Sequence, residues 1–376
     1  MTHASAHRAS LSTEQEFGRF FLPGPTEVLP DVMEAQLRPM IGHRGAAIEE
    51  LLAGVQPELK RIFRTSRPVY ISSSSATGLM EAAVRNAARG RVLSLVNGAF
   101  SERFHRITVA CGCPADALEV PWGAVHTPDL VVEALRRNTY DAVTVVHSET
   151  STGALNPIAD LARVVHESGD AMLLVDSVSG IAGTPVETDA WDIDFILTGS
   201  QKAFALPPGL AFGVAQERVL ERAKQARARG VYFDLLEFEQ YVKLNQTPNT
   251  PAVSLLYALE VQLARIGRET IEARWARHAA MARRTAEWVA EMVERGVDLR
   301  ILAPEGHRSP TVTCIILPAG VGTGREIAAQ MEVRGFTIAS GYGKLRDSTI
   351  RIGHMGDHTV AELDVLLDVL GGVLAR

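Results

Sequence analysis

Cysteine is scarce in this sequence. The 376 residues include only three cysteines, Cys111, Cys113 and Cys314. The Cys111-Gly112-Cys113 stretch lacks the second pair of ligands that a structural zinc site normally needs. So few cysteines do not make a disulfide framework, and we therefore expect free thiols, a reducing compartment and no metal site.

Long apolar segments and basic character are missing as well. No stretch is long and charge-free enough to span a bilayer, and residues 1–16 lack the apolar centre of a signal peptide. The net charge of −6 provides no positive field for nucleic acid or anionic lipid. We expect residues 1–20 to be a flexible polar leader, and the protein to be cytoplasmic without nucleic acid or membrane as a partner.

Apolar residues are nevertheless plentiful, and from about residue 68 they alternate between short runs and helix-period segments. The runs are apolar throughout, which is typical of parallel strands covered by helices on both faces. The length of the chain favours a large domain and a smaller one. The expected strands are 69–71, 92–96, 142–146, 172–175, 193–197 and 210–214, and the expected helices between them are 79–89, 101–110, 127–137 and 158–168.

The pattern changes after residue 265. A long helical stretch over residues 269–295 is followed by short strands and helices that predict a compact α+β unit. We therefore expect an N-terminal arm and a large domain over residues 21–265. A small C-terminal domain, including the long connecting helix, would cover residues 266–376.

Lys202 lies just after the apolar run 193–197 and before the turn-forming stretch Leu206-Pro207-Pro208-Gly209. A lysine delivered to a cleft by the end of a strand can be partly desolvated, which frees its lone pair for a Schiff base with a carbonyl compound. Taken alone, it would more often be a solvated surface lysine. The neighbouring motifs favour the first interpretation.

Two further motifs follow buried strands. The run Ser72-Ser73-Ser74-Ser75-Ala76-Thr77-Gly78 precedes a helix, whose unpaired N–H groups would bind a phosphate; an ordinary serine-rich helix cap is the alternative. Asp176 ends the run 172–175, at the sheet edge where ligands bind, and would pair with a protonated ring nitrogen or cap the next turn. A phosphate, a ring nitrogen and a carbonyl joined to lysine together indicate pyridoxal 5'-phosphate.

Several motifs, taken in order along the chain, resemble a known family. They are Pro23-Gly24-Pro25-Thr26, Ser75-Ala76-Thr77-Gly78, Asn97-Gly98-Ala99-Phe100, Glu149-Thr150-Ser151-Thr152-Gly153, Val175-Asp176-Ser177-Val178 and Gly199-Ser200-Gln201-Lys202-Ala203. This ordered set resembles the class V pyridoxal-phosphate aminotransferases, and within them the alanine–glyoxylate and serine–glyoxylate (serine–pyruvate) enzymes. The resemblance implies fold type I, with a mostly parallel seven-stranded sheet, a small C-terminal domain and a homodimer with shared active sites.

The resemblance also implies a role for each matching residue. Lys202 would form the Schiff base with the cofactor, and Asp176 would pair with its ring nitrogen. Arg351 would bind the α-carboxylate of the substrate, although an outward-facing arginine on an edge strand is an equal alternative. The remaining cofactor contacts would come from Ser75, Ala76, Thr77, Phe100, Ser151, Thr152, Gln201 and, from the other subunit, Thr250.

The sequence departs from the family pattern at three positions. Ala76 replaces a glycine in the phosphate loop, Phe100 replaces a tryptophan, and Thr247 stands where some animal members have a tyrosine. A fourth variable element, Gly42-His43-Arg44, resembles the His-Arg pair of transaminases for phosphoserine and aminoethylphosphonate. His43 and Arg44 would then bind a distal acidic group of the substrate.

We therefore expect ping-pong transamination of alanine or serine with glyoxylate or another 2-oxo acid. One alternative is a donor with a distal acidic group, such as aspartate, phosphoserine or 2-aminoethylphosphonate. A pyridoxal-phosphate lyase is the other, but Cys314 lies in a strand-like run and Gln201 replaces the histidine that precedes the lysine of desulfurases. A nicotinamide enzyme would need a Gly-x-Gly-x-x-Gly turn after its first strand, which this sequence lacks.

Overall fold

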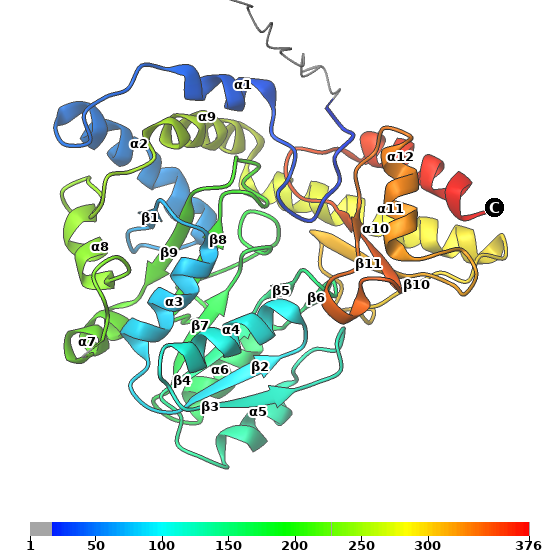
Figure 1. The fold of residues 1–376 in the computed structure, drawn as a ribbon. Coiled ribbons are helices and arrows are strands. Elements are labelled where there is room, and N and C mark those ends of the chain that lie inside the picture. Colours follow the sequence, from blue (N-terminus) through cyan, green and yellow to red (C-terminus); the bar gives the residue numbers. More distant parts are fainter. Residues whose placement is uncertain (1–16, 227, 376) are drawn as a thin grey trace, which may run out of the picture.

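The computed structural model describes residues 17–226 and 228–375, so residues 1–16 of the predicted leader lie outside the described residues. A larger α/β part and a smaller C-terminal part stand side by side and are joined by long helices (Figure 1). Within the described ranges, no helix combines the length and the apolar character needed to cross a membrane.

A seven-stranded sheet forms the centre of the larger part. Its strands, in spatial order, are β1 (Tyr70–Ser72), β9 (Ala211–Ala215), β8 (Phe195–Gly199), β7 (Met172–Asp176), β4 (Ala142–Val146), β2 (Val92–Val96) and β3 (Ala115–Glu119). Only β9 runs against its neighbours, and the ladders from β8 to β3 are parallel. The predicted doubly wound, mostly parallel sheet is confirmed. The strand β3 escaped prediction because it is a half-exposed edge strand without a continuous apolar run.

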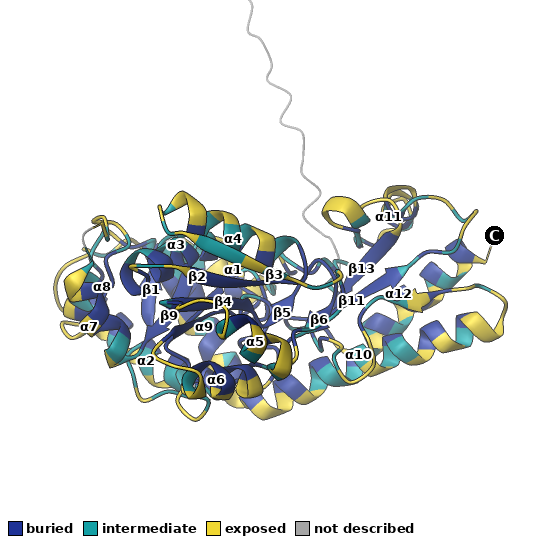
Figure 2. Cartoon of the chain, turned by 90° about the horizontal axis from the view of Figure 1, so that it is seen from below, coloured by how far each residue is buried: buried dark blue, intermediate teal, exposed yellow. Residues whose placement is uncertain are grey.

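Helices cover both faces of this sheet, and two apolar cores lie between them. Figure 2 shows the buried strands between helices whose outer sides are exposed. One face is covered by α3 (Ala76–Ala87), α4 (Ala99–Ala110), α7 (Glu217–Gln225) and α8 (Leu235–Val242). The other is covered by α2 (Ala46–Phe63), α5 (Pro128–Leu135), α6 (Ile158–Glu167) and α9 (Val253–Glu269), with the short α1 (Pro30–Glu34) and η1 (Ala35–Leu37) beside α9.

The C-terminal part has its own antiparallel sheet and core. Its strands, in spatial order, are β10 (Arg300–Ile301), β11 (Val312–Ile316), β13 (Thr349–Gly353) and β12 (Ala339–Ser340). They pack with α10 (Ile271–Glu294), α11 (Gly324–Glu332) and α12 (Val360–Leu374), and η2 (Gly343–Leu345) lies in the connection to β13. A two-stranded hairpin of β5 (Ser148–Glu149) and β6 (Ala154–Leu155) follows β4.

The N-terminal arm joins the two parts. Phe21 is fully buried in the core of the C-terminal part, and its N–H donates to Thr337 O over 2.8 Å. A few residues later, Thr26 donates to the backbone oxygen of Lys202 over 3.1 Å. The arm, which we had grouped with the large domain, therefore contacts both cores and reaches the predicted catalytic lysine.

Candidate active site

A cavity of about 340 Å³ opens where the parallel strands of the large sheet end. Its wall includes Val146 at the end of β4, Asp176 at the end of β7 and Lys202 just after β8. The first turns of α3 and α4 complete the wall beside them. Parallel strands deliver their carboxyl ends to one edge of the sheet, which is why residues far apart in the sequence meet there.

The Lys202 side chain is buried, and its Nζ donates a hydrogen bond to the backbone oxygen of Pro23. Burial, followed by the positive charge of Arg351, lowers the pKa of Lys202 to about 7. At neutral pH a large share of this amine is therefore unprotonated and able to attack a carbonyl carbon.

Gly24 makes room for this lysine. Its φ is +110°, and a Cβ added there would lie 2.4 Å from the lysine Nζ. Any other residue would therefore displace the reactive amine as well as strain the backbone. This explains the glycine of the Pro23-Gly24-Pro25 motif, whose physical role the sequence did not show.

Asp176 lies beside Lys202 on the cavity wall and is 2% exposed. Its Oδ1 accepts a hydrogen bond of 2.8 Å from the N–H of Val178. Burial raises the pKa of Asp176 to about 7, and the charge of Glu149 adds to the rise. A buried carboxylate of this kind is stabilised by a cationic partner, such as the protonated nitrogen of a bound ring.

The predicted phosphate loop is in fact the beginning of a helix. We expected α3 to start near Leu79, but it starts at Ala76, with Ser75 as its N-cap. Ser75 has the extended backbone of an N-cap but makes no side-chain capping hydrogen bond, and the small residues after it belong to the first turn itself. Ser75, Ala76 and Thr77 all lie on the cavity wall, and Ala76 fits in place of glycine because its backbone is helical. The N–H groups of this turn form an anion site.

Glu149 holds the beginning of α4. Its carboxylate accepts hydrogen bonds from the N–H groups of Phe100 (3.3 Å) and Ser101 (2.9 Å), while Ser151 Oγ accepts one from Ala99 (3.0 Å). A Cβ on Gly98 would come within 2.6 Å of both side chains, so only glycine permits this approach. The buried Glu149 thereby fixes Phe100 on the cavity wall.

The hydroxyl-rich loop around Ser151 differs in detail from the prediction. Thr150 lies on the cavity wall, whereas Ser151 and Thr152 are not among its lining residues. Ser151 is engaged with Glu149 at 2.6 Å and with α4. Gln201 and Phe100 do line the cavity, and the Phe100 ring centroid lies 6.0 Å from Lys202 Nζ. A cofactor contact of Ser151 or Thr152 stays a prediction.

Arg351 lies on β13 and points inward rather than to solvent. It is 8% exposed, and its guanidinium donates to Ser340 O (3.1 Å) and Thr150 O (3.3 Å). Burial lowers its pKa from the ordinary value, which indicates a cation held without full solvation. Arg351 is not among the residues that line the cavity, but it contacts Thr150, which does line it, so that a carboxylate-binding role for Arg351 stays a prediction.

Sequence reasoning missed Arg103 and Tyr342, which also line the cavity. Arg103 lies one turn after Phe100 on α4, with its Cζ 4.9 Å from the Phe100 ring centroid. It donates a 3.1 Å hydrogen bond to the Tyr342 hydroxyl. The three-residue spacing from Phe100 is a helical signal that could have identified Arg103. Tyr342 comes from the distant C-terminal part and has no such local signal.

His43, Arg44 and Thr250 are exposed and are not among the residues that line the cavity. Arg44 donates to the backbone oxygens of His43 (2.9 Å) and Pro248 (3.4 Å). The segment expected to bind a distal acidic group and the segment expected to reach another subunit therefore meet on the surface of this chain.

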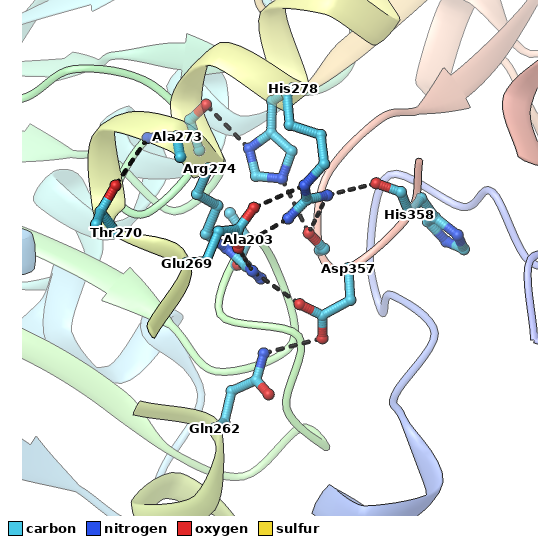
Figure 3. Close-up of polar contacts among 12 residues, drawn as sticks. Ala203, Gln262, Glu269, Thr270, Ala273, Arg274, His278, Asp357 and His358 are labelled. Carbon is cyan, nitrogen blue, oxygen red and sulfur yellow. Dashed lines mark hydrogen bonds and ion pairs between the residues drawn. The ribbon is translucent and has the colours of Figure 1, made fainter. Parts of the chain in front are cut away.

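Arg274 clamps the segment that carries the lysine. Its fully buried guanidinium donates to Ala203 O over 3.2 and 2.8 Å and pairs with Asp357 (2.7 Å) and Glu269 (2.9 Å) (Figure 3). Asp357 also accepts a hydrogen bond of 3.0 Å from Gln262. This network joins the residue after Lys202 to α9, α10 and the segment after β13.

Replacing Arg274 with methionine is expected to lower the free energy of unfolding by about 3–5 kcal/mol, because the change leaves the carboxylate of Asp357, whose side chain is 9% exposed, without its cation. Urea unfolding measures the effect. Arg283→Met, on the exposed side of the same helix, serves as the control and should stay within about 0.5 kcal/mol of wild type. A loss under about 1 kcal/mol for Arg274→Met would contradict the clamp.

The donor set fits pyridoxal 5'-phosphate. One cavity holds an amine with a lowered pKa, a buried carboxylate that lacks a cationic partner within salt-bridge distance among the described residues, an aromatic ring and a helix N-terminus. These groups match the aldehyde, ring nitrogen, ring face and phosphate of that cofactor.

Comparisons with known proteins agree with this geometry. The family profile described as Aminotransferase class-V matches residues 99–341. An aminotransferase from Methanocaldococcus jannaschii is 39% identical, covering 89% of this chain and 87% of its own. A serine–glyoxylate aminotransferase from Methylorubrum extorquens is 32% identical, with coverages of 94% and 90%. The solved structure of an alanine–glyoxylate aminotransferase from Nostoc sp. has a TM-score of 0.89 and 27% identity over the full length of both chains.

Proposed function

The chain belongs to the class-V aminotransferases, and from this premise we propose that it transfers the amino group of alanine or serine to glyoxylate. The observation that carries the proposal is the pair of Lys202 and Asp176 on one cavity wall, with both pKa values moved to about 7. An amine and an acid poised near neutrality are what proton transfer at a bound amino acid requires.

Pyridoxal 5'-phosphate, when bound, supplies an aldehyde for the amino group and a ring that withdraws electrons from the substrate Cα. The residues that would hold it all line one cavity: Lys202 would bind its aldehyde carbon, Asp176 would face its ring nitrogen, and Phe100 would contact its ring. The first turn of α3 and Gln201 would bind its phosphate. The amine of Lys202 would also carry a proton to and from the substrate Cα.

Arg351 would hold the α-carboxylate of the substrate, because its planar fork is fixed next to Thr150 on the cavity wall. Donor and acceptor are both small 2-carbon to 3-carbon acids in this proposal, and one site serves them in turn. The similarity to a serine–glyoxylate aminotransferase from Methylorubrum extorquens and an alanine–glyoxylate aminotransferase from Nostoc sp. supports glyoxylate as the acceptor.

A donor and acceptor panel tests the proposal. The purified holoenzyme should convert alanine and serine to 2-oxo acids only when glyoxylate or another 2-oxo acid is present, with the parallel initial-rate lines of ping-pong kinetics. Liquid chromatography of the amino acid and 2-oxo acid products measures both. Formation of 2-oxo acid without an acceptor would instead show a lyase.

A lyase of the desulfurase type is disfavoured by the position of Cys314. This cysteine lies within β11 and is 1% exposed, and burial raises its pKa to about 11. A sulfur-accepting thiol needs a mobile, ionised cysteine, which a buried strand residue is not.

The proposed assembly is a homodimer in the cytoplasm. The surface that carries His43, Arg44 and Thr250 adjoins apolar residues that are unusually exposed, including Leu37 (84%) and Met40 (71%). Burying such residues against a second copy is favourable, and it would bring Thr250 and His43-Arg44 near the partner's cavity. Light scattering after size-exclusion chromatography measures the mass.

A further inference from the structure

A second hollow of about 250 Å³ lies next to the catalytic cavity. Arg103 and Tyr342 line both this hollow and the catalytic cavity, so the two spaces are adjacent. We name this hollow the vestibule, and its charged lining residues are Glu102, Arg103, Arg106 and Lys344. None of the residues expected to bind the cofactor lines it.

The vestibule holds an excess of positive charge. Its lining includes three cationic side chains and only one carboxylate, that of Glu102. Across the part of the chain that the structure describes, neither Arg103, Arg106 nor Lys344 has a carboxylate within salt-bridge distance; Lys344 Nζ instead lies 4.2 Å from the Trp122 ring centroid. Cations that are not neutralised by the protein attract an anionic group of a ligand.

Arg103 is placed to contact such a group while the substrate occupies the catalytic cavity. Arg103 and Lys202 both approach the Phe100 ring, at 4.9 and 6.0 Å from its centroid. Tyr342 separates Arg103 from Arg351: its hydroxyl accepts from Arg103, and its ring centroid lies 5.4 Å from Arg351 Cζ. Two guanidinium groups thus flank the side chain of Tyr342, which lines the cavity.

We propose that the vestibule is a subsite for the second carboxylate of a dicarboxylic substrate, with Arg103 as its principal contact. This rests on the proposed function, and it extends the donor range from alanine and serine to aspartate and the acceptor range to the matching 2-oxo acid. Arg351 binds the α-carboxylate, and the distal carboxylate lies toward Arg103, Arg106 and Lys344. When alanine or serine is the donor, no second carboxylate enters the vestibule and water fills it.

The test compares kcat/KM for aspartate and alanine, with glyoxylate as acceptor and the holoenzyme as catalyst. Arg103→Met should lower the aspartate-to-alanine ratio by about 10-fold to 100-fold, the range expected for losing a charge-assisted hydrogen bond. Arg106→Met with Lys344→Met, at positions off the catalytic cavity, should lower the ratio by several-fold without loss of bound cofactor. Arg295→Met, an exposed arginine outside both hollows, is the charge-matched control and should leave the ratio unchanged.

Two further measurements separate the alternatives. Added salt should lower wild-type kcat/KM for aspartate more than for alanine, because the vestibule acts through charge. The second measurement uses phosphoserine as the amino donor. If Arg103→Met lowered the phosphoserine-to-alanine ratio of kcat/KM but not the aspartate-to-alanine ratio, the assignment to a carboxylate would be overturned. Equal losses for alanine and aspartate in Arg103→Met would also overturn it. Failure of every donor with wild-type enzyme would instead refute the proposed transamination.

Discussion

Replacing Lys202 with alanine is expected to lower kcat/KM for transamination by at least about 10³-fold, because a single side chain serves as both nucleophile and proton carrier. The amine is buried beside Gly24 and has a pKa of about 7, and no neighbouring lysine lines the cavity within the described ranges. The visible absorption that arises when the cofactor is joined to the lysine amine should disappear with the activity.

The control for this change is Lys243→Ala, because Lys243 is an exposed lysine whose ammonium pairs with Glu239 at 3.2 Å. The Lys243→Ala variant should keep the visible absorption and the transamination rate of the wild type. Circular dichroism checks that Lys202→Ala folds. Retention of more than about a tenth of the wild-type rate by a folded Lys202→Ala protein would contradict the assigned role. So would a wild-type protein that stays colourless with excess cofactor.

Replacing Asp176 with asparagine is expected to lower kcat by about 10²-fold. Asparagine keeps the shape of the side chain and an oxygen that can accept the 2.8 Å hydrogen bond from Val178, but it carries no charge. The ring nitrogen of the cofactor would then lose the anion that keeps it protonated. Single-turnover measurement of the donor half-reaction isolates this effect from product release.

Asp176→Glu provides the matched comparison, because it restores the charge in a longer side chain and should recover part of the rate. A merely structural role would predict the reverse order, with the isosteric Asn variant more active than the Glu variant. Equal rates in wild type and Asp176→Asn would show that the carboxylate has no electrostatic part in the reaction.

Most of the site's chemistry was readable from local sequence. Lys202 and Asp176 were found because each follows an apolar strand, and parallel strands bring their ends to one edge. The helix start at Ser75-Ala76-Thr77 was found by its small residues, although the boundary was placed three residues late. Helix ends are set by capping contacts that periodicity does not contain.

Apart from Arg103, the contacts that sequence reasoning missed act across long separations. Glu149 caps α4 from the end of β5, 49 residues after Phe100. Arg274 clamps Ala203 from 71 residues away, and Tyr342 meets Arg103 across a separation of 239 residues. Arg274 and Tyr342 have ordinary local settings, and the motif that contains Glu149 does not show which helix its carboxylate caps.

The sequence by itself thus determined the class of fold and the cofactor, and it placed Lys202 and Asp176 at one edge of the sheet, because hydrophobic periodicity and strand-end motifs are local properties. Only the tertiary structure decided which side chains surround that centre: the clamp at Arg274, the support of α4 by Glu149, and the vestibule formed by Arg103 with Tyr342. The cavity combines side chains of the larger part with Tyr342 from the C-terminal part, and the geometry of that combination is not encoded in any short stretch of the chain.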